Sequence, residues 1–107
     1  MIDERDLLAR VSGLRRETLH VWIERGWVAP VREGGGYAFR EIDVARVRLI
    51  EEFRTDLALG EDALDVILPL IDQVHGLRRE LHRLAGAVHA QPEEVRKRIA
   101  SALRDED

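Results

Sequence analysis

Residues 15–57 read RRETLHVWIERGWVAPVREGGGYAFREIDVARVRLIEEFRTDL, and this stretch decides the fold. Leu19, Trp22 and Ile23 have the i, i+3, i+4 spacing of a helix, which Gly26 should end. Before the Ser-Gly pair at 12–13, a short amphipathic face made of Leu7, Leu8 and Val11 indicates an earlier helix. Two helices around a glycine-containing turn predict a helix-turn-helix.

Two short β-prone runs follow, Trp27 to Val31 and Tyr37 to Phe39, joined by the glycine-rich residues 32–36. Pro30 limits the first run to an edge strand, and the glycines let the loop turn freely. The runs predict a small two-stranded hairpin, or wing. A third helix is expected from Glu41 to Leu57, with Asp43 near its positive N-terminal end and an inner side made of Val44, Val47, Ile50, Phe53 and Leu57.

A heptad pattern fills the second half of the chain. Apolar residues recur at alternating spacings of four and three, at Ala63, Ile67, Leu70, Val74, Leu77, Leu81, Leu84 and Val88. A helix of about 28 residues would reach roughly 40 Å, too long for so small a head to cover. We therefore expect a homodimer whose self-association seam is Leu70, Val74, Leu77, Leu81, Leu84 and Val88. The alternative is that residues 63–74 cap the head and only the distal half is exposed.

The sequence thus predicts a mainly α-helical protein with a winged helix-turn-helix head, residues 1–60, and a helical arm, residues 61–107. The arm should hold a long helix over about 61–90 and a short charged helix over about 93–104. Pro69 removes a backbone donor, so a kink or break is expected over 65–68. The short helix has an apolar side that could fold back on the long one, made of Val95, Ile99 and Leu103. Residues 105–107 are expected to fray.

Charge argues against a strong grip on nucleic acid. The 107 residues carry a net charge of −4, and residues 15–57 hold eight Arg and no Lys against eight acidic residues. Lys and Arg side chains that neutralise phosphates supply most of the sequence-independent affinity for DNA, so a head without net positive charge should bind DNA weakly. The absence of Cys, the acidic start Met1-Ile2-Asp3-Glu4 and the lack of a long apolar block lead us to expect a soluble cytoplasmic protein.

Enzyme and metal chemistry find no support, and we expect no cofactor. His75, His82 and His89 repeat every seven residues, so on one helix they would lie roughly 10 Å apart in succession and cannot share a metal. Ser12 and Ser101 have no recognisable base beside them.

The run Leu19 to Pro30, with Gly36 to Phe39 and Asp43 to Ile50, resembles a MerR-type head. The continuation, residues 57–60, 63–72 and 77–81, makes the chain more similar to CbpM, the chaperone-modulator family. This resemblance covers roughly residues 5–90. It implies a small protein that binds the J-domain of a CbpA/DnaJ-like co-chaperone and blocks its work with the Hsp70 chaperone DnaK.

Departures from DNA-binding MerR relatives fall at contact positions. Those relatives usually have an Arg-Tyr pair where this chain has His20 and Val21, and an Arg where it has Ala38. The candidate residual DNA contacts are Arg15, Arg16, His20 and Arg40, although an ordinary solvated surface is the reading we favour for the arginines. Trp22 and Trp27 fit core packing better than a stacking platform for bases.

J-domains resemble one another in having a basic second helix, so a competitor should present carboxylates. The candidate partner-binding residues are Glu51, Glu52, Asp56, Asp62, Asp65 and Asp72, with Glu61 beside them. The alternative for this acidic face is a solvated surface balanced by arginines. Two functions remain open: a J-domain-binding modulator, which we favour, and a dimeric MerR-type DNA-binding transcription regulator.

Overall fold

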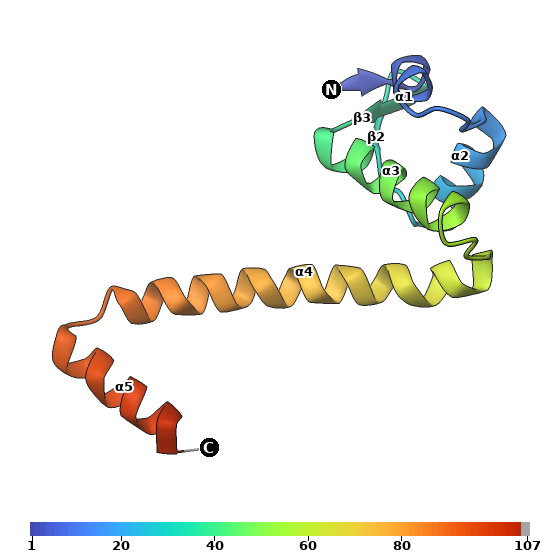
Figure 1. The fold of residues 1–107 in the computed structure, drawn as a ribbon. Helices are drawn as coiled ribbons and strands as arrows, with labels where there is room; N and C mark the ends of the chain where they lie inside the picture. Colours follow the sequence, from blue (N-terminus) through green and yellow to red (C-terminus); the bar gives the residue numbers. More distant parts are fainter. Residues whose placement is uncertain (106–107) are drawn as a thin grey trace. The chain divides into compact units, whose positions relative to one another are not determined.

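The computed structural model describes residues 1–105, which form five helices and one three-stranded antiparallel sheet (Figure 1). In chain order these are β1 (Ile2–Asp3), α1 (Glu4–Arg10), α2 (Arg16–Glu24), β2 (Val31–Glu33), β3 (Gly36–Phe39), α3 (Glu41–Thr55), α4 (Glu61–His89) and α5 (Glu93–Asp105). The mainly helical fold, with a long helix and then a short one, confirms the prediction. Of the expected frayed residues, Asp105 ends α5, whereas 106–107 lie outside the described part of the chain.

The chain divides into two compact units, Met1–Leu68 and a second one that begins at Pro69. The expected head ended at residue 60. The first compact unit also includes the first two turns of α4, because those turns pack on the helix-turn-helix.

The helix-turn-helix forms where the apolar spacing places it. Asp3 caps α1 by accepting a hydrogen bond from the Asp6 backbone N–H at 2.8 Å, and Leu7 of α1 is fully buried. Gly26 follows α2 with a φ of +78°, a conformation that glycine adopts without steric penalty. The predicted end of this helix is confirmed.

The sheet is larger than the predicted wing. Its order is β1-β3-β2, so the N-terminal residues add a third strand beside β3 (Figure 1). The expected strand from Trp27 is wrong in its bounds, because β2 begins only at Val31. Trp27 instead donates its backbone N–H to the Trp22 carbonyl at 3.0 Å, which extends the end of α2 and turns the indole into the core.

A two-residue turn closes the wing. Gly34 and Gly35 have φ values of +55° and +78°, and Glu33 pairs directly with Gly36. Positive φ at both central residues is the requirement of a type I′ turn, whose twist matches that of the flanking strands. The predicted five-residue loop therefore contracts to two residues.

One apolar core lies among α1, α2, α3, the sheet and the base of α4. Its fully buried large side chains are Leu7, Leu19, Val28, Phe39, Val47, Ile50, Leu64 and Leu68. Trp22 and Trp27 are only 3% and 6% exposed, so they pack in the core and leave no stacking platform for bases. This confirms the prediction made for both tryptophans.

Helix α3 ends two residues earlier than predicted. It stops at Thr55, and Leu57, expected on its inner side, is 62% exposed. The chain turns here to enter α4: Ala58 has a φ of +53° and the Leu59 N–H reaches back to the Phe53 carbonyl at 3.0 Å.

The base of α4 packs through Leu64 and Leu68, which are 2% and 1% exposed. The heptad positions Ala63 and Ile67 beside them are only half-buried. Of the kink or break predicted over 65–68, the break is wrong, because α4 continues as one helix through Pro69. Burial of each leucine stabilises by about 1.5–3 kcal/mol, which together offsets the roughly 3 kcal/mol that an internal proline costs.

Beyond Pro69, the apolar stripe of α4 is exposed. Leu77, Leu81 and Leu84 have exposed fractions of 64%, 65% and 61%. Helix α5 does not fold back to cover them, since it turns away after α4 and has no buried residue (Figure 1). Within residues 1–105, no helix combines the length and apolar character that a membrane span requires.

Candidate functional site

One face of α2 carries an arginine and a histidine that share one internal carboxylate. Arg16 and His20 are four residues apart and so lie on one face of the helix. Glu4, the first residue of α1, contacts both: its Oε1 atom lies 3.5 Å from Arg16 Nε and in close contact with His20 Nε2. The exposed fractions of the Glu4, His20 and Arg16 side chains are 21%, 36% and 69%. The carboxylate is thus inserted against the helix and the arginine is outermost.

Tyr37 joins this face to the wing. The His20 ring meets the Tyr37 ring edge-on, with the ring centres 5.7 Å apart, and the guanidinium of Arg32, the cross-strand partner of Tyr37, lies over the Tyr37 ring, 5.7 Å from its centre. Arg15, the N-cap of α2, is exposed and makes no ion pair within residues 1–105. The structure therefore brings two of the four candidate DNA contacts together, Arg16 and His20, and leaves a third, Arg15, exposed at the start of α2.

Arg40, the fourth candidate, is used to start α3. Its guanidinium donates to both carboxylate oxygens of Asp43 at 3.0 Å and to the Ala29 carbonyl at 3.2 Å. Asp43 also accepts the Arg40 backbone N–H at 2.9 Å and is only 4% exposed. The hydrogen bond to this carboxylate and its charge raise the pKa of Arg40. Arg40 thus serves helix capping first.

The carboxylates at the end of α3 differ in availability. Glu51 is held by the Arg54 guanidinium at 2.9 and 3.0 Å, and its side chain is 12% exposed. Glu52 and Asp56 are exposed and line an open cleft of about 290 Å³ between α3 and the turn after α1. Arg10 and Arg48 also line this cleft, so its charge is mixed.

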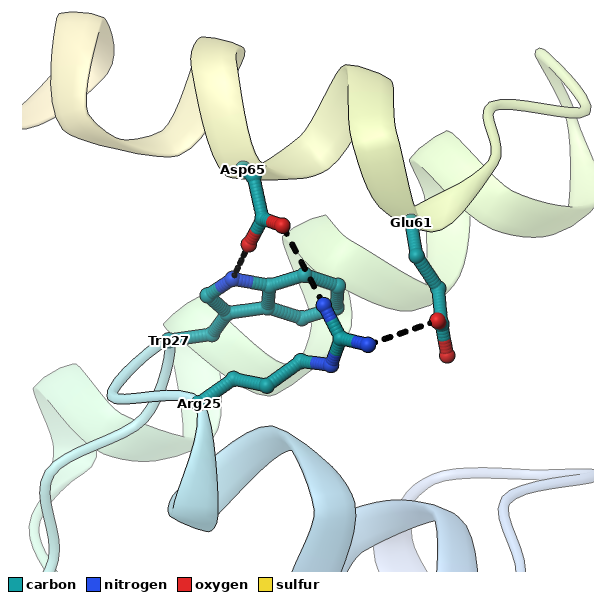
Figure 2. A network of polar contacts seen from close by, with 4 residues as sticks. All are labelled: Arg25, Trp27, Glu61 and Asp65. Atoms are coloured by element: carbon teal, nitrogen blue, oxygen red, sulfur yellow. Dashed lines mark hydrogen bonds and ion pairs between the residues drawn. The ribbon is translucent and has the colours of Figure 1, made fainter.

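Two further acidic residues hold α4 to the helix-turn-helix (Figure 2). Arg25, just past α2, lies between Glu61 at 2.8 Å and Asp65 at 3.1 Å, and its guanidinium is 5.3 Å from the centre of the Trp27 ring. Asp65 also accepts a hydrogen bond from the Trp27 indole N–H at 2.8 Å. Asp65, a candidate partner residue, is therefore occupied inside the head.

No local pattern in the sequence indicates this network, because its partners are 36 to 40 residues apart. The residues just past α2 that take part belong to the run Arg25-Gly26-Trp27. In the sequence this run indicates only the end of a helix and a tryptophan of the core. Of the remaining acidic candidates, Asp62 is exposed in the first turn of α4, and Asp72 already has an interaction within the chain.

The candidate self-association residues form a continuous exposed stripe. Leu70 and Val74 are 52% and 46% exposed, and Val88 near the end of α4 is half-buried. His75, His82 and His89 are exposed on the same helix, and no group of three or more His, Cys, Asp or Glu side chains within residues 1–105 is placed to hold a metal ion.

Comparison with known proteins agrees with the head that the structure contains. No curated protein and no solved structure matches the chain. A family model described as MerR HTH family regulatory protein matches residues 5–85, which include the helix-turn-helix, the wing, α3 and most of α4. On this match over most of its length, the chain belongs to the MerR HTH family of regulatory proteins.

Proposed function

We propose that this protein is a regulator that works by binding another protein, without catalysis. The proposed partner is the J-domain of a CbpA/DnaJ-like co-chaperone, and the proposed effect is to block the action of that co-chaperone with Hsp70 in the cytoplasm. The resemblance of residues 5–90 to the CbpM family supplies the identity of the partner.

The observation that carries the proposal is the distribution of paired and unpaired charge on the head. Glu4 contacts Arg16 and His20, and Asp43 holds Arg40, so three of the four candidate phosphate ligands are already occupied by carboxylates. Glu52, Asp56 and Asp62 instead remain exposed, which favours a cationic partner over a polyanion. A basic J-domain helix has the complementary charge.

We also propose that the stripe of α4 beyond Pro69 pairs with a second copy of the chain. Three leucines with exposed fractions above 60% in succession are a poor surface for an isolated helix in water. The heptad spacing of this stripe matches the packing of one helix against another of the same kind.

Calorimetric titration of the full chain with a J-domain from the same cell tests the proposal. The exposed carboxylates are neutralised in a Glu52→Gln plus Asp56→Asn variant. We expect the affinity to fall by about fivefold or more at low salt, and wild-type affinity to weaken as ionic strength shortens the Debye length to about 8 Å.

The matched control is Glu17→Gln plus Glu24→Gln, two exposed carboxylates of α2 whose loss changes the net charge equally. It should bind the J-domain nearly as the wild type does. Failure of the wild type to bind any J-domain at low salt would remove the proposal, and equal losses in the two variants would remove the assigned surface.

DNA-binding regulation is the second candidate, because the family match is to regulatory helix-turn-helix proteins and Arg15 and Arg32 are exposed beside α2 and the wing. An electrophoretic shift that depends on DNA sequence, and disappears in an Arg15→Ala plus Arg16→Ala variant, would favour it. A shift that is equal for all sequences would not.

A further inference from the structure

We propose that Glu4 is an internal competitor for phosphate, which closes a latent polyanion-binding surface on α2 and the wing. The surface consists of Arg16 and His20, which contact Glu4, of Arg32, which with His20 contacts Tyr37, and of the exposed Arg15 at the start of α2. The proposed occupant is the phosphate backbone of a DNA duplex. This goes beyond the proposed J-domain function and does not depend on it.

The position of the carboxylate is the first argument. A phosphate approaching Arg16 and His20 would seek the Nε atoms that Glu4 Oε1 already contacts. Hydrogen bonds to an ionised group are stronger than those between neutral groups. The Glu4 carboxylate is already attached to the protein, so it forms them without the loss of translational freedom that a binding phosphate undergoes. The anion must displace Glu4 before it gains these contacts.

Secondary structure fixes the backbone position of Glu4. Glu4 is the first residue of α1. Asp3, directly before it, is both the N-cap of α1 and the last residue of β1, which pairs with β3. The Glu4 side chain is only 21% exposed, because it lies against α2. The same sheet carries Tyr37, which contacts His20, so one rigid unit positions both the competitor and its targets.

A neutral residue at position 4 would leave positive charge on α2 and the wing without a nearby carboxylate. Arg16 would then have no acidic partner within residues 1–105, and it would join Arg15 and Arg32, which have no ion pair there already. The released Arg16 can displace about one condensed counterion from DNA, so the salt dependence of binding should steepen together with the affinity.

Fluorescence anisotropy with a labelled duplex of mixed sequence, at about 50 mM salt, tests the inference. The full-chain variant Glu4→Gln keeps the size of the side chain and removes its charge. We expect its DNA affinity to rise about fivefold to tenfold over the wild type, with a steeper dependence on salt concentration.

Asp6→Asn is the matched control, because Asp6 lies in the same turn of α1, is exposed, and gives the same change in net charge without touching α2. It should bind DNA as the wild type does. A double variant, Glu4→Gln plus Arg16→Ala, should lose most of the gain. Circular dichroism of each variant establishes that it is folded.

Equal DNA affinity for Glu4→Gln and Asp6→Asn would overturn the inference, since it would reduce the effect to net charge. A gain that survives Arg16→Ala would also overturn it. Glu4 lies outside the acidic residues proposed for the J-domain, so calorimetry on Glu4→Gln should give wild-type J-domain affinity, and the two proposals can fail separately.

Discussion

The indole N–H of Trp27 donates a 2.8 Å hydrogen bond to Asp65 Oδ1, joining the loop after α2 to the second turn of α4. The other oxygen of the same carboxylate binds Arg25. Asp65 therefore ties two neighbouring residues of the head to α4 beside the buried Leu64 and Leu68. An acidic residue that sequence alone assigned to a partner is part of the fold.

Asp65→Ala should lower the free energy of unfolding by about 1–2 kcal/mol, because it removes both bonds and leaves the indole N–H of a mostly buried tryptophan without its acceptor. Asp65→Asn keeps an acceptor for Trp27 and should lose less. Urea unfolding followed by tryptophan fluorescence measures both. Asp62→Ala is the control, since it makes the same substitution at an exposed position of α4 and should stay within about 0.5 kcal/mol of the wild type.

Asp43→Ala should destabilise the head by about 1–2 kcal/mol, because the Arg40 backbone N–H and the start of α3 lose their buried acceptor. Glu41→Ala removes an acidic residue from the same first turn at an exposed position and should have a much smaller effect. Chemical denaturation of the two variants makes the comparison. Similar losses of unfolding free energy for both variants would mean that the helix dipole, and not the Asp43 cap, stabilises the N-terminus of α3.

The same cap should be insensitive to mild alkali. Asp43 raises the pKa of Arg40, so the stability that this pair contributes is present below the usual arginine pKa and is lost only above it. The difference in unfolding free energy between wild type and Asp43→Ala should therefore stay constant from about pH 7 to pH 10. Denaturation curves across that range test it, and a steady decrease in the difference would contradict the assignment.

Gly35→Ala should destabilise the wing by about 1 kcal/mol, because its φ of +78° is strained for any residue with a β-carbon. Gly36→Ala is the neighbouring control. Its added β-carbon would meet only the Glu33 carbonyl at 3.9 Å, an ordinary contact, and its φ lies outside the left-handed region. Gly35→Asn should be milder than Gly35→Ala, since asparagine tolerates the left-handed conformation. Thermal melts rank the three.

Leu77→Glu plus Leu81→Glu should abolish self-association, because carboxylates would replace the centre of the exposed apolar stripe. Light scattering should give twice the chain mass for the wild type and a single chain mass for the variant. Gln73→Glu plus His82→Glu adds the same charge at exposed positions of α4 outside the heptad seam and should remain dimeric. A wild type of single chain mass would refute the seam.

The helical elements could be predicted because their causes are local. Apolar spacing located α1 to α3, the heptad pattern located α4, and Gly26 marked the end of α2. The strands were harder. β1 has two residues and exists only because its backbone pairs with β3, so no window of sequence around Ile2 contains its reason.

Pro69 shows how packing changes the outcome of a local rule. A proline inside a helix predicts a break, yet α4 continues because Leu64 and Leu68 bury fully against the head just before it. The heptad pattern likewise predicted Ala63 and Ile67 as the apolar positions at the base of α4. The fully buried positions are instead Leu64 and Leu68, each one residue further along the helix, which pack in the core of the head.

Sequence by itself determined the fold class and the sparse positive charge of the head, because both follow from apolar periodicity and from composition. Tertiary structure decided which charges remain available. Glu4 against His20, Asp43 against Arg40 and Asp65 against Arg25 are all charge pairs made or oriented by folding, and two of the three join residues at least 16 positions apart. A carboxylate and an arginine neutralise each other only at contact distance, and contact between distant residues is set by packing.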